Sequence, residues 1–564
     1  MKGKYAFWSI LMLLFILLLA ACSGDGGADP SASEEGNEAG NEAGNEEGTS
    51  EQKGSNAAGD QVLVYARGGD SVSLDFASIS DGESSRVTKN IFESLLDYDK
   101  ESFEVVPGLS HDWEVSDDGL SYTFFLEEDV TFHDGTPFNA EAVKINFERW
   151  ADPKHKYAFT DQGYAYPLYG TMFGGYKGDD THNIKEINVI NDYEIEFVLK
   201  APQGPFLQNM AMHYFAMTSP AALEKYGPDI GENPVGTGPF KFVSWSKNDQ
   251  IILEKFADYR KEGLPKLDQV IFEVIPENSA RLIALRSGEV DIIDGINPDD
   301  AAGIESEEGL ELYVRGENNV GFLGMNVEKE PLNDKLVRQA INYAVDTEAI
   351  VEALYADYAT TAINLIPPNY FGYNEEIKAY GYDVERAQEL LAEAGYDNGF
   401  ELDLWVMPVS RPYMPDPETV AEIVQSNLEE VGITTNIVRE EWAPYLEKTG
   451  KGEHELYLLG WSGSNGDPDY FFDSLLHGDS IGGENRSFYK NNEVDELIDQ
   501  AGAEIDQDQR AELYKQVQAI LHEEAPGVNI VHSTPLAAAK SEVKNFIPHP
   551  STSDPLEEVE IATE

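Results

Sequence analysis

Between about residues 60 and 240, hydrophobic residues recur in short runs that turn residues interrupt, a pattern typical of β-strands. One longer segment, 139–150, has helical spacing instead. We therefore predict that the first part of the chain is rich in β-structure. The predicted strands are 62–65, 121–126, the two strands of a hairpin at 189–199, and a further pair that opens at 236–240.

After about residue 318 the apolar spacing changes to the period of an amphipathic helix. Val337, Ala340, Ile341 and Ala344 fall on one helical face, and residues 387–394 repeat the pattern before Gly395. An alternation of strands and helices follows, so this part of the chain is predicted to be α/β. The predicted order is strand 402–407, helix 418–431, strand 433–438, helix 443–448 and strand 455–460.

Two polar loops follow predicted strands of this segment, at 408–413 and 461–469. Strand-helix-strand units form parallel sheets, and ligands bind such sheets beyond the carboxyl ends of the strands. Arg411 offers a planar fork for a carboxylate, while Tyr413 and Trp461 offer flat walls with a hydrogen-bonding group. A solvated loop arginine is the alternative interpretation of Arg411. We predict a ligand site where the two loops open on one edge.

The most continuous apolar stretch, 6–18, follows two lysines and precedes Leu-Ala-Ala-Cys at 19–22. These features predict a signal peptide over 1–21. The ending resembles the bacterial lipoprotein pattern, which implies that the Cys22 sulfur receives diacylglycerol and tethers the mature chain to a membrane. An ordinary signal peptide with an accidental cysteine is the alternative. Cys22 is the only cysteine, so no intramolecular disulfide is expected.

Residues 22–60 are predicted to be a disordered, acidic and glycine-rich linker, because they contain no aromatic and no large aliphatic residue. The whole chain has a formal net charge of −65, which disfavours nucleic acid as a partner since phosphates would be repelled. An acidic surface of this kind suggests a protein that works outside the cell in salty or alkaline surroundings, where salt screens the repulsion between its charges. The alternative is an ordinary soluble protein that is merely acidic.

Several motifs of the chain from about residue 61 onward resemble those of one protein family. The similar segments are 107–109, 113–119, 234–240, 319–323, 337–340, 364–368, 407–413 and 465–469. They resemble the peptide/nickel-binding family of ABC-transporter solute-binding proteins, most of all its dipeptide-binding members.

The resemblance implies an α/β fold of the large, type II periplasmic-binding-protein class, a two-lobed clamshell with an extra subdomain. It implies domain Ia at 61–95, 232–317 and 535–564, domain Ib at 96–231, and domain II at 318–534. The implied function is capture of dipeptides or short peptides by lobe closure and delivery to an ABC permease and its ATPase. We expect a monomer without a cofactor, lipid-anchored on the extracytoplasmic face of the cell membrane, on a Gram-positive-type surface.

The resemblance also implies roles for single residues. Arg411 would grip the ligand's carboxylate, and relatives that bind dipeptides have an aspartate for the ligand's α-ammonium where this chain has Ser464. Asp467 is either a replacement for that aspartate or a turn residue. The other residues implied to line the ligand site are Tyr413, Gly460, Trp461, Ser80 and Gly82.

Because Ser464 departs from the dipeptide pattern, oligopeptides, glutathione, haem and nickel chelates stay open as ligands on this scaffold. An anchored hydrolase is a remote alternative. The sequence contains no His-Glu-x-x-His motif, and residues 460–464 miss Gly-x-Ser-x-Gly at the last position. We therefore predict a binding protein rather than an enzyme.

Overall fold

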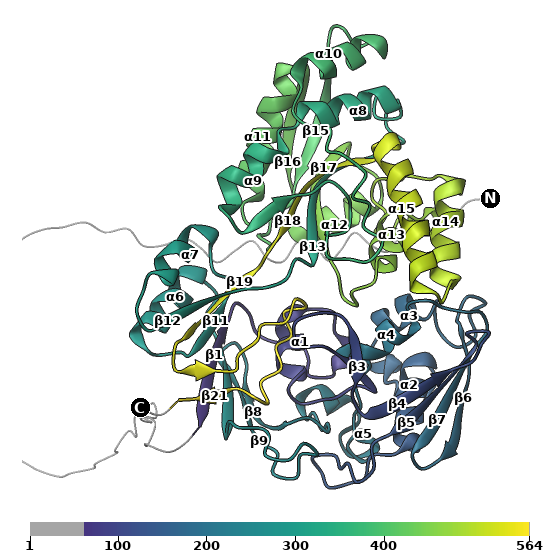
Figure 1. Ribbon diagram of the computed structural model, residues 1–564, viewed down its shortest axis with the longest axis vertical. Coiled ribbons are helices and arrows are strands. Elements are labelled where there is room, and N and C mark those ends of the chain that lie inside the picture. The colour runs from purple at the N-terminus through teal and green to yellow at the C-terminus, as the bar shows by residue number, and fades with distance from the viewer. Residues whose placement is uncertain (1–60, 563–564) are drawn as a thin grey trace, which may run out of the picture. The chain divides into compact units, whose positions relative to one another are not determined.

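The computed structural model describes residues 61–562. The predicted signal peptide, the linker and Cys22 lie outside the described residues. Three larger sheets, of seven, six and four strands, organise the described part of the chain (Figure 1). No helix between residues 61 and 562 is long and apolar enough to cross a membrane.

The seven-stranded sheet has the order β12-β19-β11-β1-β10-β9-β8. Its central strand β1 runs parallel to β10 and β11, and the other pairs are antiparallel. All of its strands come from the ranges 61–95, 232–317 and 535–562. They are β1 (Val62–Arg67), β8 (Phe240–Ser246), β9 (Gln250–Lys255), β10 (Gln269–Val274), β11 (Ile292–Asp294), β12 (Leu310–Val314) and β19 (Leu536–Lys540).

Short elements surround this sheet. The helices are η1 (Phe76–Ser78), α1 (Gly82–Thr88), α6 (Asn278–Ser287) and α7 (Pro298–Glu305), and the small strands are β2 (Leu96–Tyr98), β3 (Val105–Pro107), β20 (Val543–Lys544) and β21 (Glu560–Ile561).

The four-stranded sheet, β4-β5-β7-β6, is antiparallel throughout. The hairpin and the helix predicted for this region are confirmed. In β5 every second side chain is buried, namely Tyr122, Phe124 and Leu126, as the period of a half-buried strand requires. The elements of this region are β4 (Ser110–Val115), β5 (Ser121–Leu126), β6 (Ile184–Asn191), β7 (Glu194–Leu199), α2 (Ala140–Ala151), α3 (Pro167–Met172), α4 (Phe206–Ala211), α5 (Pro220–Tyr226), η2 (Thr160–Gln162), η3 (His213–Phe215) and η4 (Gly227–Glu232).

The six-stranded sheet has the order β14-β18-β13-β17-β15-β16. The predicted strand-helix-strand-helix-strand segment is confirmed, and β15 runs parallel to both β16 and β17. Antiparallel β13 and β18 extend the sheet, so it is mixed rather than wholly parallel. Its strands are β13 (Asn319–Met325), β14 (Ala359–Thr361), β15 (Phe400–Val406), β16 (Ile433–Arg439), β17 (Leu456–Ser462) and β18 (Gly527–Ser533).

Helices pack on this sheet by the apolar faces predicted for them. In α8, Val337, Ala340, Ile341 and Ala344 are fully buried. The helices of this region are α8 (Lys335–Ala344), α9 (Thr347–Tyr355), α10 (Val384–Glu393), α11 (Pro417–Glu430), α12 (Trp442–Gly450), α13 (Asp469–Leu476), α14 (Asn492–Ala503), α15 (Gln507–Glu524) and η5 (Gly478–Ser480).

We call residues 61–317 with 535–562 the first lobe and residues 318–534 the second lobe. The chain passes between them twice, from β12 to β13 and from β18 to β19 (Figure 1). These two passages lie side by side, because β12 pairs with β19 and the backbone N–H of Arg315 donates to the carbonyl of Pro535 at 3.0 Å. The fold is therefore an α/β protein of two lobes joined by a narrow, two-stranded connection.

Candidate ligand-binding site

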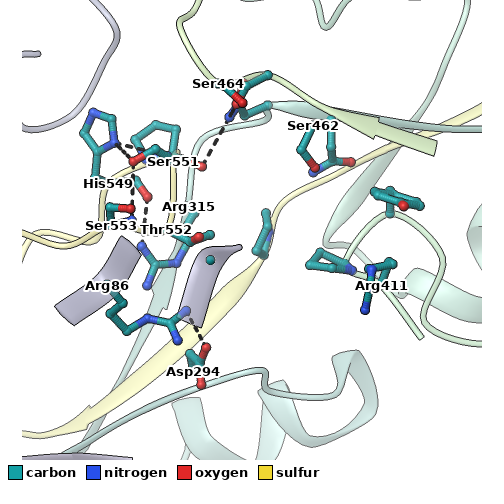
Figure 2. A pocket seen from close by; sticks show the side chains of 18 of the residues that line it. Arg86, Asp294, Arg315, Arg411, Ser462, Ser464, His549, Ser551, Thr552 and Ser553 are labelled. Carbon is teal, nitrogen blue, oxygen red and sulfur yellow. Dashed lines mark hydrogen bonds and ion pairs between the residues drawn. The ribbon is translucent and has the colours of Figure 1, made fainter. Parts of the chain in front are cut away.

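A cavity of about 1360 Å³ lies between the two lobes. The first lobe contributes the loop before α1, the connection at Arg315 and a C-terminal segment around His549. The second lobe contributes the loops that follow β15 and β17. Figure 2 shows Arg411 and Ser462 on one side and His549, Ser551, Thr552 and Ser553 on the other. A cavity of this volume has room for a short peptide together with several water molecules.

Arg411 sits in a tight turn of the loop that follows β15. Its backbone N–H donates to the carbonyl of Met414 at 3.0 Å, and the N–H of Met414 donates back at 2.9 Å. The guanidinium carbon lies 5.4 Å from the ring centre of Trp442 on α12, and Nη1 donates to the carbonyl of Ser410 at 3.2 Å. The turn thus presents an exposed guanidinium to the cavity.

The charges around the cavity single out Arg411. Eight lysines and arginines line the cavity, and seven of them are within 4.0 Å of a carboxylate. Among residues 61–562, Arg411 has no such partner. A guanidinium facing a cavity without a counter-ion is suited to a carboxylate of a ligand. The paired cations and their partners are Arg86 with Asp294, Lys89 with Asp97, Lys100 with Glu558, Lys261 with Glu557, Arg281 with Asp294, Arg315 with Asp554, and Arg486 with Glu484.

Tyr413 and Gly460 shape the wall beside Arg411. The ring of Tyr413 lies against Gly460, where a Cβ would come within 2.3 Å of its Cδ2 atom, so position 460 admits only glycine. The carbonyl of Tyr413 accepts from the Tyr355 hydroxyl at 2.8 Å. Burial raises the pKa of Tyr413 to about 12, although Arg411 opposes the shift, so the phenol is a neutral donor at neutral pH.

Trp461 and Ser464 form the wall that follows β17. The indole of Trp461 lies 5.3 Å from the ring of Tyr470, and both residues line the cavity with Ser464. The Nε1–H group of Trp461 is buried and has no acceptor within the described part of the chain. A buried donor without a partner costs about 1–3 kcal/mol.

On the first-lobe side, Ser80 and Gly82 line the cavity. Sequence reasoning missed the C-terminal segment that faces them. Thr552 Oγ1 lies 3.7 Å from the position of a Cβ on Gly82, and His549 and Ser551 also line the cavity (Figure 2). Asp554 fixes this segment, since its oxygens accept from Arg315 at 2.5 and 2.8 Å. No local pattern signals contacts that span more than two hundred positions.

Of the two interpretations of Asp467, the geometry favours the turn residue. Its side chain is fully buried, does not line the cavity, and accepts from Nη1 and Nη2 of Arg510 at 2.7 Å each. Its Oδ1 also accepts from the N–H of Asp469 at 3.0 Å. Because both oxygens are engaged, Asp467 is a structural residue of the turn and cannot replace the carboxylate that Ser464 lacks.

A metal site is not built into the described part of the chain: residues 61–562 contain no group of three or more His, Cys, Asp or Glu side chains arranged to hold an ion. Two histidines line the cavity, and burial lowers the pKa of both His213 and His549, that of His213 to about 3. They are neutral at physiological pH.

Comparison with known proteins places the chain among transport proteins. Residues 104–483 match the family model of bacterial extracellular solute-binding proteins, family 5. The Heme-binding protein A of Haemophilus influenzae is 35% identical over 546 residues, which cover 95% of each chain. The Dipeptide-binding protein of Escherichia coli is 36% identical over 484 residues, covering 84% of this chain and 89% of that protein.

A solved structure agrees in fold. The periplasmic binding protein DppA of Helicobacter pylori, in complex with the peptide STSA, superposes with a TM-score of 0.77 at 33% identity, covering 89% of this chain and 98% of that chain. The two-lobed α/β clamshell is thus the type II periplasmic-binding-protein fold. The chain belongs to family 5 of the bacterial extracellular solute-binding proteins.

Proposed function

We propose that this protein captures a dipeptide or short peptide in the cavity between its lobes and delivers it to the permease and ATPase of an ABC importer. One observation carries the proposal: Arg411 faces the cavity without a carboxylate partner among residues 61–562. Peptide ligands of two proteins similar to this chain support it.

In this proposal the ligand's carboxylate lies on the Arg411 guanidinium, where two parallel N–H···O bonds fix its orientation. The rings of Tyr413 and Trp461 flank the peptide. Closure of the lobes removes water from these contacts and strengthens them. No covalent step is required.

Haem is the second candidate ligand, because the relative that covers 95% of this chain is named a heme-binding protein. Arg411 would then meet a propionate rather than a peptide carboxylate. Haem has a strong visible absorption spectrum, so titration of the protein with haem separates the two candidates directly.

We further propose that Cys22 carries a diacylglycerol anchor and that the protein works on the extracytoplasmic face of the cell membrane as a monomer. The Leu-Ala-Ala-Cys ending of the apolar segment and membership of an extracellular solute-binding family support this location.

Two measurements test the ligand proposal. Native mass spectrometry of the purified protein identifies a co-purified ligand by mass, and isothermal titration with dipeptides gives the affinity. Arg439→Ala is the matched control for Arg411→Ala, because Arg439 also lies at the carboxyl end of a second-lobe strand, β16, but pairs with Glu418 at 2.7 Å outside the cavity. Equal dipeptide affinity of both variants would contradict the proposal.

A further inference from the structure

We propose that Asp81, on the first-lobe wall of the cavity, is the counter-charge for the α-ammonium of the ligand. A zwitterionic peptide would then connect the two lobes, with its carboxylate on Arg411 and its ammonium on Asp81. The inference rests on the proposed peptide-binding function and specifies which end of the peptide each lobe holds.

Most carboxylates of the cavity wall already have a cation of the protein as their partner. Seven line the cavity, and five are neutralised by a lysine or arginine of the protein itself. Within residues 61–562, Asp81 and Asp99 have no cation within 4.0 Å. A ligand ammonium therefore finds only these two uncompensated carboxylates. The neutralised five are Glu83, Asp97, Asp294, Glu484 and Glu557.

Asp81 and Asp99 differ in their surroundings on the cavity wall. Asp99 belongs to the turn between β2 and β3, where its Oδ1 accepts from the Glu101 N–H at 3.0 Å and the Ser102 hydroxyl at 3.3 Å. Asp81 lies between Ser80 and Gly82, which both line the cavity. Asp81 thus stands on the wall formed by the loop before α1.

Aromatic residues connect this loop with the second-lobe wall. The hydroxyl of Ser85 on α1 donates to the Tyr214 hydroxyl at 2.9 Å. The same Ser85 oxygen lies 2.8 Å from the backbone carbonyl oxygen of Asp81, so Tyr214 is next to the Asp81 turn. Burial is the main cause of the raised pKa of Tyr214, and Tyr470 and Asp81 raise it further. Tyr470 in turn packs against Trp461. Asp81 is therefore near the subsite that Trp461 and Ser464 line.

The Asp81 carboxylate has a free oxygen for this role. Oδ1 accepts from the Ser84 N–H at 2.8 Å and so caps α1, whereas no bond to Oδ2 is found within the described residues. An ammonium enclosed in the cavity without a counter-charge would be strongly disfavoured. Because Arg411 and Asp81 belong to different lobes, both contacts form together only when the lobes approach, and the zwitterion stabilises closure.

Asp81→Asn tests the inference without removing the helix cap, because asparagine caps helices as well as aspartate and keeps Oδ1 for Ser84. The probes are Ala-Phe and N-acetyl-Ala-Phe, measured by isothermal titration. We expect the wild-type protein to prefer the free amine by about 10-fold or more, and Asp81→Asn to bring the two affinities within about 3-fold by weakening Ala-Phe alone. Asp99→Asn is the matched control and should keep the wild-type preference.

An unchanged preference in Asp81→Asn would overturn the inference, as would its loss in Asp99→Asn instead. The proposed function fails separately: if Arg411→Ala binds both peptides as the wild type does, the carboxylate site is wrong. If the wild-type protein binds neither peptide, both the function and this inference fall. If Arg411→Ala loses both peptides while Asp81→Asn keeps the preference, only the assignment of Asp81 is refuted.

Discussion

The side-chain amide of Asn465 in the second lobe donates from Nδ2 to Oδ1 of Asn209 in the first lobe at 2.8 Å, and both residues are buried. Nearby, the N–H of Gly204 donates to the carbonyl of Gly502 at 2.7 Å. Gly466 lies so close to Phe103 that a Cβ would come within 2.1 Å of the Phe103 Cβ. The lobes therefore contact each other through protein atoms as well as through any ligand.

Asn209→Ala should weaken ligand binding although Asn209 does not line the cavity. The variant leaves the Asn465 amide without its acceptor, which costs the closed form about 1–2 kcal/mol and lowers affinity about 5- to 30-fold. Titration calorimetry measures this loss, and small-angle scattering should show a larger unliganded radius of gyration. Asn188→Ala, which removes a bond to Glu196 within one sheet, is the control. Equal affinities in the two variants would refute the role of the contact.

Arg411→Ala should remove the charge-assisted fork for the ligand carboxylate. We expect a loss of about 2–5 kcal/mol, or about 30-fold to more than 1,000-fold in dissociation constant. Arg411→Lys should recover only part of the loss, because an ammonium cannot form two parallel bonds. Both variants should unfold at the wild-type temperature, since Arg411 is exposed and makes no ion pair with residues 61–562. Unchanged affinity in folded Arg411→Ala would place the carboxylate site elsewhere.

Asp467→Asn should reduce stability and leave ligand selectivity unchanged. The substitution removes the charge opposite the buried Arg510 guanidinium, and breaking a buried pair on one side costs about 3–5 kcal/mol. Urea unfolding measures this cost. Glu418→Gln breaks an exposed pair with Arg439 instead and should cost less than about 1 kcal/mol. A change in the preference for free-amine peptides in Asp467→Asn would contradict a purely structural role.

Stability should depend on pH through Asp469, the first residue of α13. Burial raises its pKa to about 7, with Asp473 and Asp467 as further causes. The unfolded carboxyl ionises near pH 4, whereas the folded one keeps its proton up to about pH 7. The unfolded state thus binds fewer protons between these values, and stability from this group is full below about pH 4 and is lost as pH rises to about 7.

Asp469→Asn removes this titration. We expect the free energy of unfolding of the variant, relative to the wild type, to rise from about pH 4 to about pH 7 and to be constant above. Chemical unfolding at a series of pH values provides the comparison. A difference that does not change with pH would mean that Asp469 titrates alike in both states.

Cys22→Ser should prevent lipid attachment, because serine lacks the thiol that accepts diacylglycerol. The variant is expected in the medium or as an uncleaved precursor, and detergent-phase partitioning of the two proteins distinguishes it from the wild type. Ser23→Ala, next in the sequence, is the control and should keep the anchor. A serine variant that partitions into detergent as the wild type does would refute the lipoprotein interpretation.

Local patterns were sufficient to predict much of the second lobe. The period of α8 and the strand-helix alternation from β15 to β17 follow from side-chain spacing, and both loops after these strands do open into one cavity. The binding roles of Arg411 and Trp461 stay predictions.

Contacts between residues that lie far apart in the sequence could not be predicted from local patterns. Arg510 lies 43 positions from Asp467, and Asp554 lies 239 positions from Arg315. Charged residues are numerous in this chain, so neither pair stands out in the sequence. The antiparallel partners β13 and β18 were missed for the same reason, since their contacts join segments about two hundred residues apart.

The pairing of β12 with β19 makes residues 318–534 one continuous insertion whose two ends meet. Such a segment can be exchanged between related chains as a cassette, with two junctions that are hydrogen-bonded neighbours. An exchange of this kind would transfer Arg411 and the loop that presents it while leaving Asp81 in place. If the two proposed roles hold, the groups that bind the two ends of a ligand can change independently, one in the cassette and one in the rest of the chain.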